Sequence, residues 1–142
     1  MVLGLFDGSI DVATDRPSYL RGDTINCSCT LKLQEPIDAR ELRVLFQRIE
    51  GSGKYTEYTE LAEFSLDSER TYRDGEHFEF ALPVDEKAAP EFVKFGGLAG
   101  FIQSIATQRR VRWEIRVSLD RPMELDVSGH VYPAISRPVV QK

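Results

Sequence analysis

The chain has 142 residues, of which 42% are hydrophobic and 29% are charged, and its formal net charge is -5. This length suffices for one buried core, so we expect a single domain over residues 1–142. The acidic balance argues against broad affinity for nucleic acid, because that affinity requires a surplus of Lys and Arg to neutralise phosphates.

The first clear element is a strand at residues 24–33, where apolar side chains stand at every second position. A weaker strand at 9–14 precedes it, and a turn at 21–23 lies between the two. Cys27 and Cys29 fall on the same face of the longer strand, so they are poorly placed to bond each other. We expect both to be buried, reduced thiols.

The middle of the chain predicts three weaker strands, at residues 41–49, 61–66 and 76–82. In the last of these, the side chains at positions 78, 80 and 82 are all apolar and share one face. Turn-forming residues at 51–53 and 74–75 separate the three strands from one another. This part of the chain therefore continues the pattern of short strands joined by turns.

One stretch departs from that pattern and predicts an amphipathic helix of about three turns at residues 98–107. Two arginines follow its apolar stripe, where a helix dipole favours positive charge. The stripe and the arginines are Leu98, Phe101, Ile102, Ile105, Arg109 and Arg110. Two interpretations stay open: the helix plugs one end of the fold, or it docks on a membrane surface or another protein.

The clearest strand covers residues 111–120, which alternate apolar and polar side chains throughout. Another strand is expected to begin at 123 and to extend toward 131, after a turn at 121–122. About seven short strands separated by turns are typical of an antiparallel sandwich, because a parallel sheet needs a helix after almost every strand. The sequence predicts an all-β, immunoglobulin-like β-sandwich with one short amphipathic helix.

Five short pieces of the chain, taken in order, are similar to sequence patterns of a single superfamily. They are residues 19–25 (YLRGDTI), 37–44 (IDARELRV), 74–83 (DGEHFEFALP), 89–92 (APEF) and 111–120 (VRWEIRVSLD). Each piece alone is a weak signal, but their shared order over about residues 10–132 is more specific. On these pieces the chain resembles the arrestin-like superfamily, which includes bacterial sporulation-control proteins of the Spo0M type and retromer subunits.

The resemblance implies an arrestin-type sandwich, with three departures. Arg21 stands where the family usually has proline, and the expected helix at 98–107 follows the strand at 76–82, whereas the arrestin helix comes before it. Family members normally carry two sandwiches, so the chain is expected to be either a stand-alone half that pairs with itself or a piece of a longer protein. Residues matching the family's phosphate sensor, receptor-binding loops or clathrin-adaptor motifs are not found.

The sequence offers no catalytic, metal or cofactor site. His77 and His130 fall in expected strands without a marked nucleophile nearby, and the two cysteines lack further ligands at metal-binding spacing. Outward-facing carboxylates, including those at 60 and 63, are explained by solvation. The arginines around 109–121 are read as a solvated strand face, with contact to an anion or a lipid headgroup as the alternative.

We therefore expect a protein that binds a partner and is not an enzyme. The first hypothesis is an arrestin-like adaptor or regulatory scaffold that binds an unidentified protein through edge strands or loops, with homodimerisation through the same edges. The alternative is a peripheral membrane module that uses the stripe and arginines of residues 98–110. The absence of an apolar run long enough to span a membrane, and of a secretory signal in residues 1–9, leads us to expect a cytoplasmic location.

Overall fold

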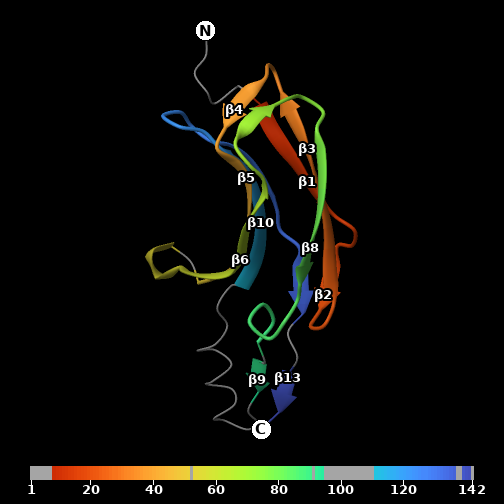
Figure 1. Ribbon diagram of the computed structural model, residues 1–142. Helices are drawn as coiled ribbons and strands as arrows, with labels where there is room; N and C mark the ends of the chain where they lie inside the picture. The colour runs from red at the N-terminus through yellow and green to blue at the C-terminus, as the bar shows by residue number, and fades with distance from the viewer. Residues whose placement is uncertain (1–7, 52, 91, 95–110, 137–138, 142) are drawn as a thin grey trace.

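The computed structural model describes residues 8–51, 53–90, 92–94, 111–136 and 139–141. These residues form two antiparallel sheets that face each other, together with three smaller two-stranded sheets (Figure 1). The apolar side chains that alternate along the strands meet between the two larger sheets and form a single buried core. The all-β sandwich predicted from the sequence is confirmed.

The first sheet has three antiparallel strands with β3 at its centre. In order across the sheet they are β1 (Gly8–Thr14), β3 (Thr24–Leu33) and β8 (His77–Pro83). The apolar side chains of β3 at positions 25, 27, 29, 31 and 33 are all buried, and the intervening side chains face outward. The strict alternation in the sequence therefore predicts correctly where this strand begins and ends and which of its side chains face the core.

The second sheet has four antiparallel strands with β10 and β5 at its centre. In order they are β11 (Val127–Val131), β10 (Val111–Asp120), β5 (Glu41–Glu50) and β6 (Glu57–Asp67). Val44 and Phe46 of β5 lie opposite Val117 and Ile115 of β10, and all four are buried in the core. This paired apolar face packs against the inner face of the first sheet.

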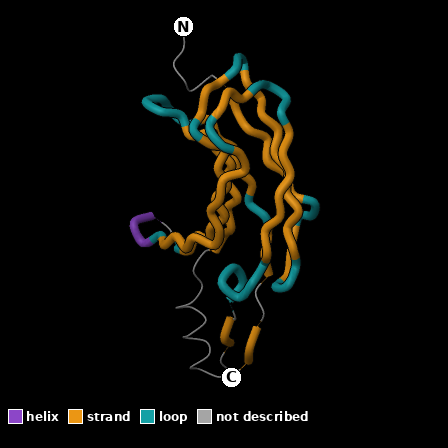
Figure 2. The backbone as a smooth tube through the Cα atoms, viewed as in Figure 1, coloured by secondary structure: helices purple, strands orange, loops and turns teal. Residues whose placement is uncertain are grey.

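The smaller sheets lie at the ends of the sandwich. β4 (Ile37–Ala39) pairs antiparallel with β7 (Arg70–Tyr72) at one end. At the opposite end, β9 (Phe92–Lys94) and β13 (Val139–Gln141) pair in parallel (Figure 1). The remaining parallel pair consists of β2 (Ser18–Leu20) and β12 (Ala134–Ser136), and a short 3-10 helix at Gly53–Tyr55 lies in the hairpin between β5 and β6 (Figure 2).

One predicted strand begins later than expected. The segment from 123 was expected to be extended, but β11 begins at Val127. Met123 has a left-handed φ of 61°, and the Asp126 carboxylate accepts a hydrogen bond from the Arg121 backbone N–H at 3.1 Å. These features form a turn, which the alternating residue pattern concealed. The helix expected at 98–107 lies outside the described residues.

The two sides of the sandwich differ. On one side the backbones of β1 and β11 lie in direct contact, since a Cβ atom at Gly129 would lie 1.7 Å from the carbonyl oxygen of Ile10. We call this the closed side. On the other side, β6 and β8 approach through their side chains, with the ring centroids of Phe64 and Phe80 6.1 Å apart in an edge-to-face contact. We call this the open side.

Candidate binding surface

The open side presents the outer edges of two strands. β6 pairs with β5 and β8 pairs with β3, and within the described part of the chain neither has a strand partner on its other edge. Unpaired edges expose backbone N–H and C=O groups that can pair with another extended segment. β6 is the longer of the two, with 11 residues against 7 in β8.

A row of incompletely buried apolar side chains lies between these edges. Phe64 is 36% exposed and lies against Phe80, which is itself partly buried. Other members of the row pack on the core from one side and reach solvent on the other. We call this row the open seam: it comprises Leu61, Ala62, Phe64, Leu66, Phe78 and Phe80. A second strand laid along either edge would cover it.

A β-bulge decides which side chains of β6 face outward. Phe46 pairs with Ala62, but the next residue of β5, Gln47, pairs with Glu60, so Leu61 is left without a partner of its own. Because of this extra residue, Glu60 and Glu63 both point to the outer face, although their spacing of three would put them on opposite faces of a regular strand. Ala62 faces the core between them.

The outer face of β6 is acidic and incompletely neutralised. β6 carries four carboxylates and no Lys or Arg, and two of the carboxylates, Glu60 and Glu63, point to its outer face. Asp67 lies opposite the buried Leu42 and pairs with Arg70 at 2.9 Å. Glu63 lies 3.7 Å from the guanidinium of Arg43, which makes a closer contact of 2.7 Å with Glu41. Glu60 has no ion pair among the described residues. An extended, partly apolar edge is therefore bordered by negative charge.

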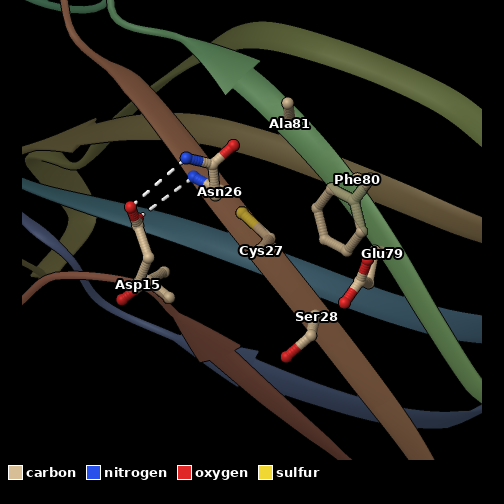
Figure 3. Close-up of a pocket in the computed structure, with 8 residues that line it drawn as sticks. Asp15, Asn26, Cys27, Ser28, Glu79, Phe80 and Ala81 are labelled. Atoms are coloured by element: carbon tan, nitrogen blue, oxygen red, sulfur yellow. Dashed lines mark hydrogen bonds between the residues drawn. The ribbon is translucent and has the colours of Figure 1, made fainter.

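The outer face of the first sheet holds a hollow of about 590 Å³ (Figure 3). Small or polar side chains of β3 and β8 line it, among them Ser28 and Ala81. At its rim the Asp15 carboxylate accepts hydrogen bonds from the backbone N–H and the Nδ2 of Asn26, at 3.2 and 3.3 Å. The Tyr19 hydroxyl, which donates to Asp15 at 2.6 Å, makes the largest contribution to lowering the pKa of that carboxyl. These polar groups bind one another and hold a turn.

A buried carboxylate lies on the outer face of the second sheet. Glu114 is 2% exposed and accepts hydrogen bonds from Gln47 at 2.7 Å, and from Arg116 and Tyr132 at 3.2 Å each. Burial raises the pKa of Glu114, but these donors together outweigh burial and hold the pKa below its ordinary value. Gln47 belongs to β5, and Tyr132 directly follows β11. The Glu114 carboxylate therefore links its own strand, β10, to both neighbouring strands of the second sheet.

Three long side chains hold consecutive backbone carbonyls after β8. Arg21 donates from Nε and Nη2 to the Ala89 carbonyl at 2.9 and 2.7 Å, and the indole N–H of Trp113 donates to that of Ala88 at 2.8 Å. Arg48 binds the Lys87 carbonyl. We call these contacts the carbonyl clamp. They explain the arginine at position 21, where the arrestin-like superfamily usually has proline, because proline has no side-chain donor that could bind the Ala89 carbonyl.

The site residues predicted from the sequence lie outside the described part of the chain. They are Leu98, Phe101, Ile102, Ile105, Arg109 and Arg110. Their role in partner or membrane contact stays a prediction. Of the neighbouring arginines, Arg112 is exposed and lies over the Tyr132 ring, Arg116 binds Glu114, and Arg121 is buried beside Glu124. Arg112 and Arg116 therefore lie on the same solvated face of β10, on either side of Glu114, as the sequence predicts, whereas Arg121 is buried and does not belong to that face.

The cysteines agree with the expectation of buried, reduced thiols, and both histidines lie in the strands where they are expected. Cys27 and Cys29 are free and buried on one face of β3, and burial raises the pKa of Cys27 to about 12 and that of Cys29 to about 11. His77 and His130 are about half exposed, with side-chain values of 51% and 49%. Within the described residues no three His, Cys, Asp or Glu side chains are grouped to hold a metal ion, and no helix is long and apolar enough to cross a membrane.

Sequence reasoning identified the strands of the open side but not the surface they form. The shared face of Phe78 and Phe80 was visible in the alternation, and Glu60 and Glu63 were read as solvated charges. The missing information was the bulge at Leu61 and the approach of β8 to β6, both of which depend on pairing between distant segments.

These two facing sheets define the class of the fold: it is an antiparallel β-sandwich. Among solved structures, the chain is similar to Spo0M, the sporulation control protein of Bacillus subtilis, with a TM-score of 0.65 and 15% sequence identity. The match covers 92% of this chain and 49% of the Spo0M chain, so this chain spans about half the length of Spo0M. At this identity the likeness shows a common fold.

A second match is the curli protein CsgC of E. coli, with a TM-score of 0.31 and 14% identity over 87% of this chain and 96% of that one. That score is too low to indicate a shared fold. No family model and no curated protein matches the sequence. The structural likeness to Spo0M therefore agrees with the resemblance read from the five sequence pieces.

Proposed function

We propose that this chain is a non-enzymatic regulatory scaffold that binds a partner protein along its open side. The description of Spo0M as a control protein supports a regulatory role for a chain with the same fold. The mode we propose is strand addition, in which an extended segment of the partner pairs with an exposed sheet edge through main-chain hydrogen bonds.

The observation that carries this proposal is the combination of the β6 edge and the open seam. β6 offers 11 residues of strand without a described partner on its outer edge, and Phe64 of the same strand is 36% exposed. Backbone pairing at an edge supplies affinity, and the side-chain surface next to it supplies specificity. A partner strand would obtain both on this side of the molecule.

Affinity capture from a lysate of the native host, compared between variants, tests the proposal. Phe64→Ser removes an aromatic ring from the open seam, and Leu125→Ser is the matched control because Leu125 is also an exposed apolar residue, at 57%, outside the open side. We expect a protein that is retained by the wild type and by Leu125→Ser but lost by Phe64→Ser. Capture of the same proteins by all three chains, or of none above background, contradicts the proposal.

Two expectations from the sequence remain to be tested in solution. Homodimerisation predicts a mass of two chains in size-exclusion chromatography with light scattering, and a strict monomer at high concentration contradicts it. Membrane docking by residues 98–110 predicts co-flotation with anionic liposomes at low salt, and absence of the chain from the floating fraction contradicts it.

A further inference from the structure

We infer that the segment taken up by β6 is an extended stretch of a partner protein in which Lys or Arg alternates with apolar residues. This inference rests on the proposed function and names the chemistry of the partner. It follows from the facing of the β6 side chains, from their charge and from the exposed seam beside them. The inference does not depend on the acidic groups alone, because it combines them with the unpaired strand edge and the apolar seam that they border.

The facing of β6 sets the pattern of the partner strand. Glu60 and Glu63 point to the outer face, and Ala62 and Phe64 point to the inner face toward β8. A strand added to this edge continues the pleat, so its side chains also alternate between the two faces. One set then lies beside the two glutamates, and the other covers Phe64 and the open seam.

The charge of β6 sets the sign of the outward-facing set. Glu60 has no ion pair among the described residues, and Arg43 is shared between Glu63 at 3.7 Å and Glu41 at 2.7 Å. A cation on the added strand would therefore meet carboxylates that are not fully neutralised. Opposite charges on adjacent strands stabilise the pair, whereas like charges directly opposite destabilise it. The outward-facing positions of the partner are accordingly Lys or Arg.

The same charges disfavour two other occupants. Pairing of β6 with β6 of a second copy would place the four carboxylates of each strand in one two-stranded ladder, without a Lys or Arg in either strand. An anionic lipid surface would likewise meet a border of negative charge. A basic, partly apolar segment satisfies both the charge and the apolar seam.

Fluorescence anisotropy with labelled peptides tests the inference directly. The probe is a peptide of about nine residues that alternates Lys with Val, a length within the usual range for strands. Its control has the same composition with all lysines placed before all valines. At low salt we expect the wild type to bind the alternating peptide at least about fivefold more tightly than the block peptide, because only alternation sorts the two sets of side chains onto opposite faces.

Two charge-reversal variants locate the interaction. Glu60→Lys with Glu63→Lys should weaken binding of the alternating peptide by about tenfold or more. The matched control, Asp11→Lys with Glu35→Lys, makes the same change in net charge at exposed positions outside β6 and should alter affinity by less than about twofold. Affinity of the wild type should also fall as salt is raised, because exposed charge pairs are screened.

Several results overturn the inference. They are failure of the alternating peptide to bind the wild type at millimolar concentration, equal binding of the block peptide, and equal losses in the two charge-reversal variants. Failure of the inference can be told apart from failure of the proposed function. A captured partner that is lost by Phe64→Ser but kept by Glu60→Lys with Glu63→Lys supports binding at the open side and rejects a basic segment as the occupant.

Discussion

On both the closed and the open side of this sandwich an edge of one sheet meets an edge of the other, but the contact differs between the two sides. On the closed side, β11 and β1 meet backbone to backbone, and a glycine at position 129 makes the contact possible. On the open side, β6 and β8 meet through the rings of Phe64 and Phe80 and leave apolar surface exposed. From this difference we expect the closed side to contribute more to stability than the open side, whose edges form the proposed binding surface.

The largest effect is expected where the closed side is tightest. Gly129→Val places a side chain where a Cβ atom alone would lie 1.7 Å from the Ile10 carbonyl oxygen, so the two backbones must separate. We expect a loss of about 3 kcal/mol in the free energy of unfolding, measured by urea denaturation. Ser128→Ala, at the exposed neighbouring position, serves as the control. If Gly129→Val lost no more unfolding free energy than the control, the backbone contact of the closed side would not be important for stability.

A smaller effect is expected at Glu114, which joins β5, β10 and the residue after β11. Glu114→Gln should cost about 2 kcal/mol near pH 7, because hydrogen bonds to a buried charged group are replaced by weaker ones. Since the folded-state pKa of Glu114 lies below the ordinary value of 4.5, the wild type holds this stabilisation above about pH 4.5 and loses it as pH falls through the lowered pKa.

The difference in unfolding free energy between wild type and Glu114→Gln should therefore shrink as the pH falls below about 4.5. Urea denaturation at a series of pH values measures it. A difference that grows below that pH would contradict the lowered pKa, and with it the role of this carboxylate in linking β5, β10 and the residue after β11.

A third test measures how much the aromatic contact of the open side contributes to the free energy of unfolding. Phe64→Ala should cost only about 1 kcal/mol, because the ring is already 36% exposed and gains little from burial. A double-mutant cycle with Phe80→Ala should give a coupling energy of about 0.5–1 kcal/mol for the edge-to-face pair. A loss equal to that of Gly129→Val would mean that the open side is as essential to the fold as the closed side.

The smallest effect on stability is expected for the charges of β6. Glu60→Lys with Glu63→Lys should change the unfolding free energy by less than about 0.5 kcal/mol, because both side chains are exposed. Thermal or urea unfolding checks this, and it also shows that a loss of peptide binding in the same variant is not caused by unfolding. Strong destabilisation of this variant would indicate that the two glutamates are needed for the folding of β6 and would argue against a role in binding.

Sequence reasoning succeeded where the facing of a strand is set by its own residues. β3 and β10 begin and end where their alternation predicts, because each has one buried and one outward face along its whole length. β6 begins at Glu57, earlier than the predicted 61, because the bulge at Leu61 interrupts the period of two. The turn at Met123 was missed because nothing in the residue pattern announces a left-handed φ at a methionine.

The candidate surface was harder to predict, because it arises from residues far apart in the chain. Glu60 and Glu63 could be recognised as outward-facing charges, but not as borders of an apolar seam built with β8. The carbonyl clamp was likewise hidden, because Arg21 reaches Ala89 across 68 positions of sequence. Local alternation determines a strand, whereas which edges stay open depends on the pairing of the whole sheet.

The bulge at Leu61 also bears on how this surface could arise. Because Leu61 has no partner of its own on β5, deleting it would leave the pairs Phe46 with Ala62 and Gln47 with Glu60 next to each other in a regular ladder. The core would keep its register, and only the bend of the edge would change. A single-codon insertion or deletion at this position could therefore reshape the β6 edge in one genetic step, without the compensating core mutations that a register shift would require.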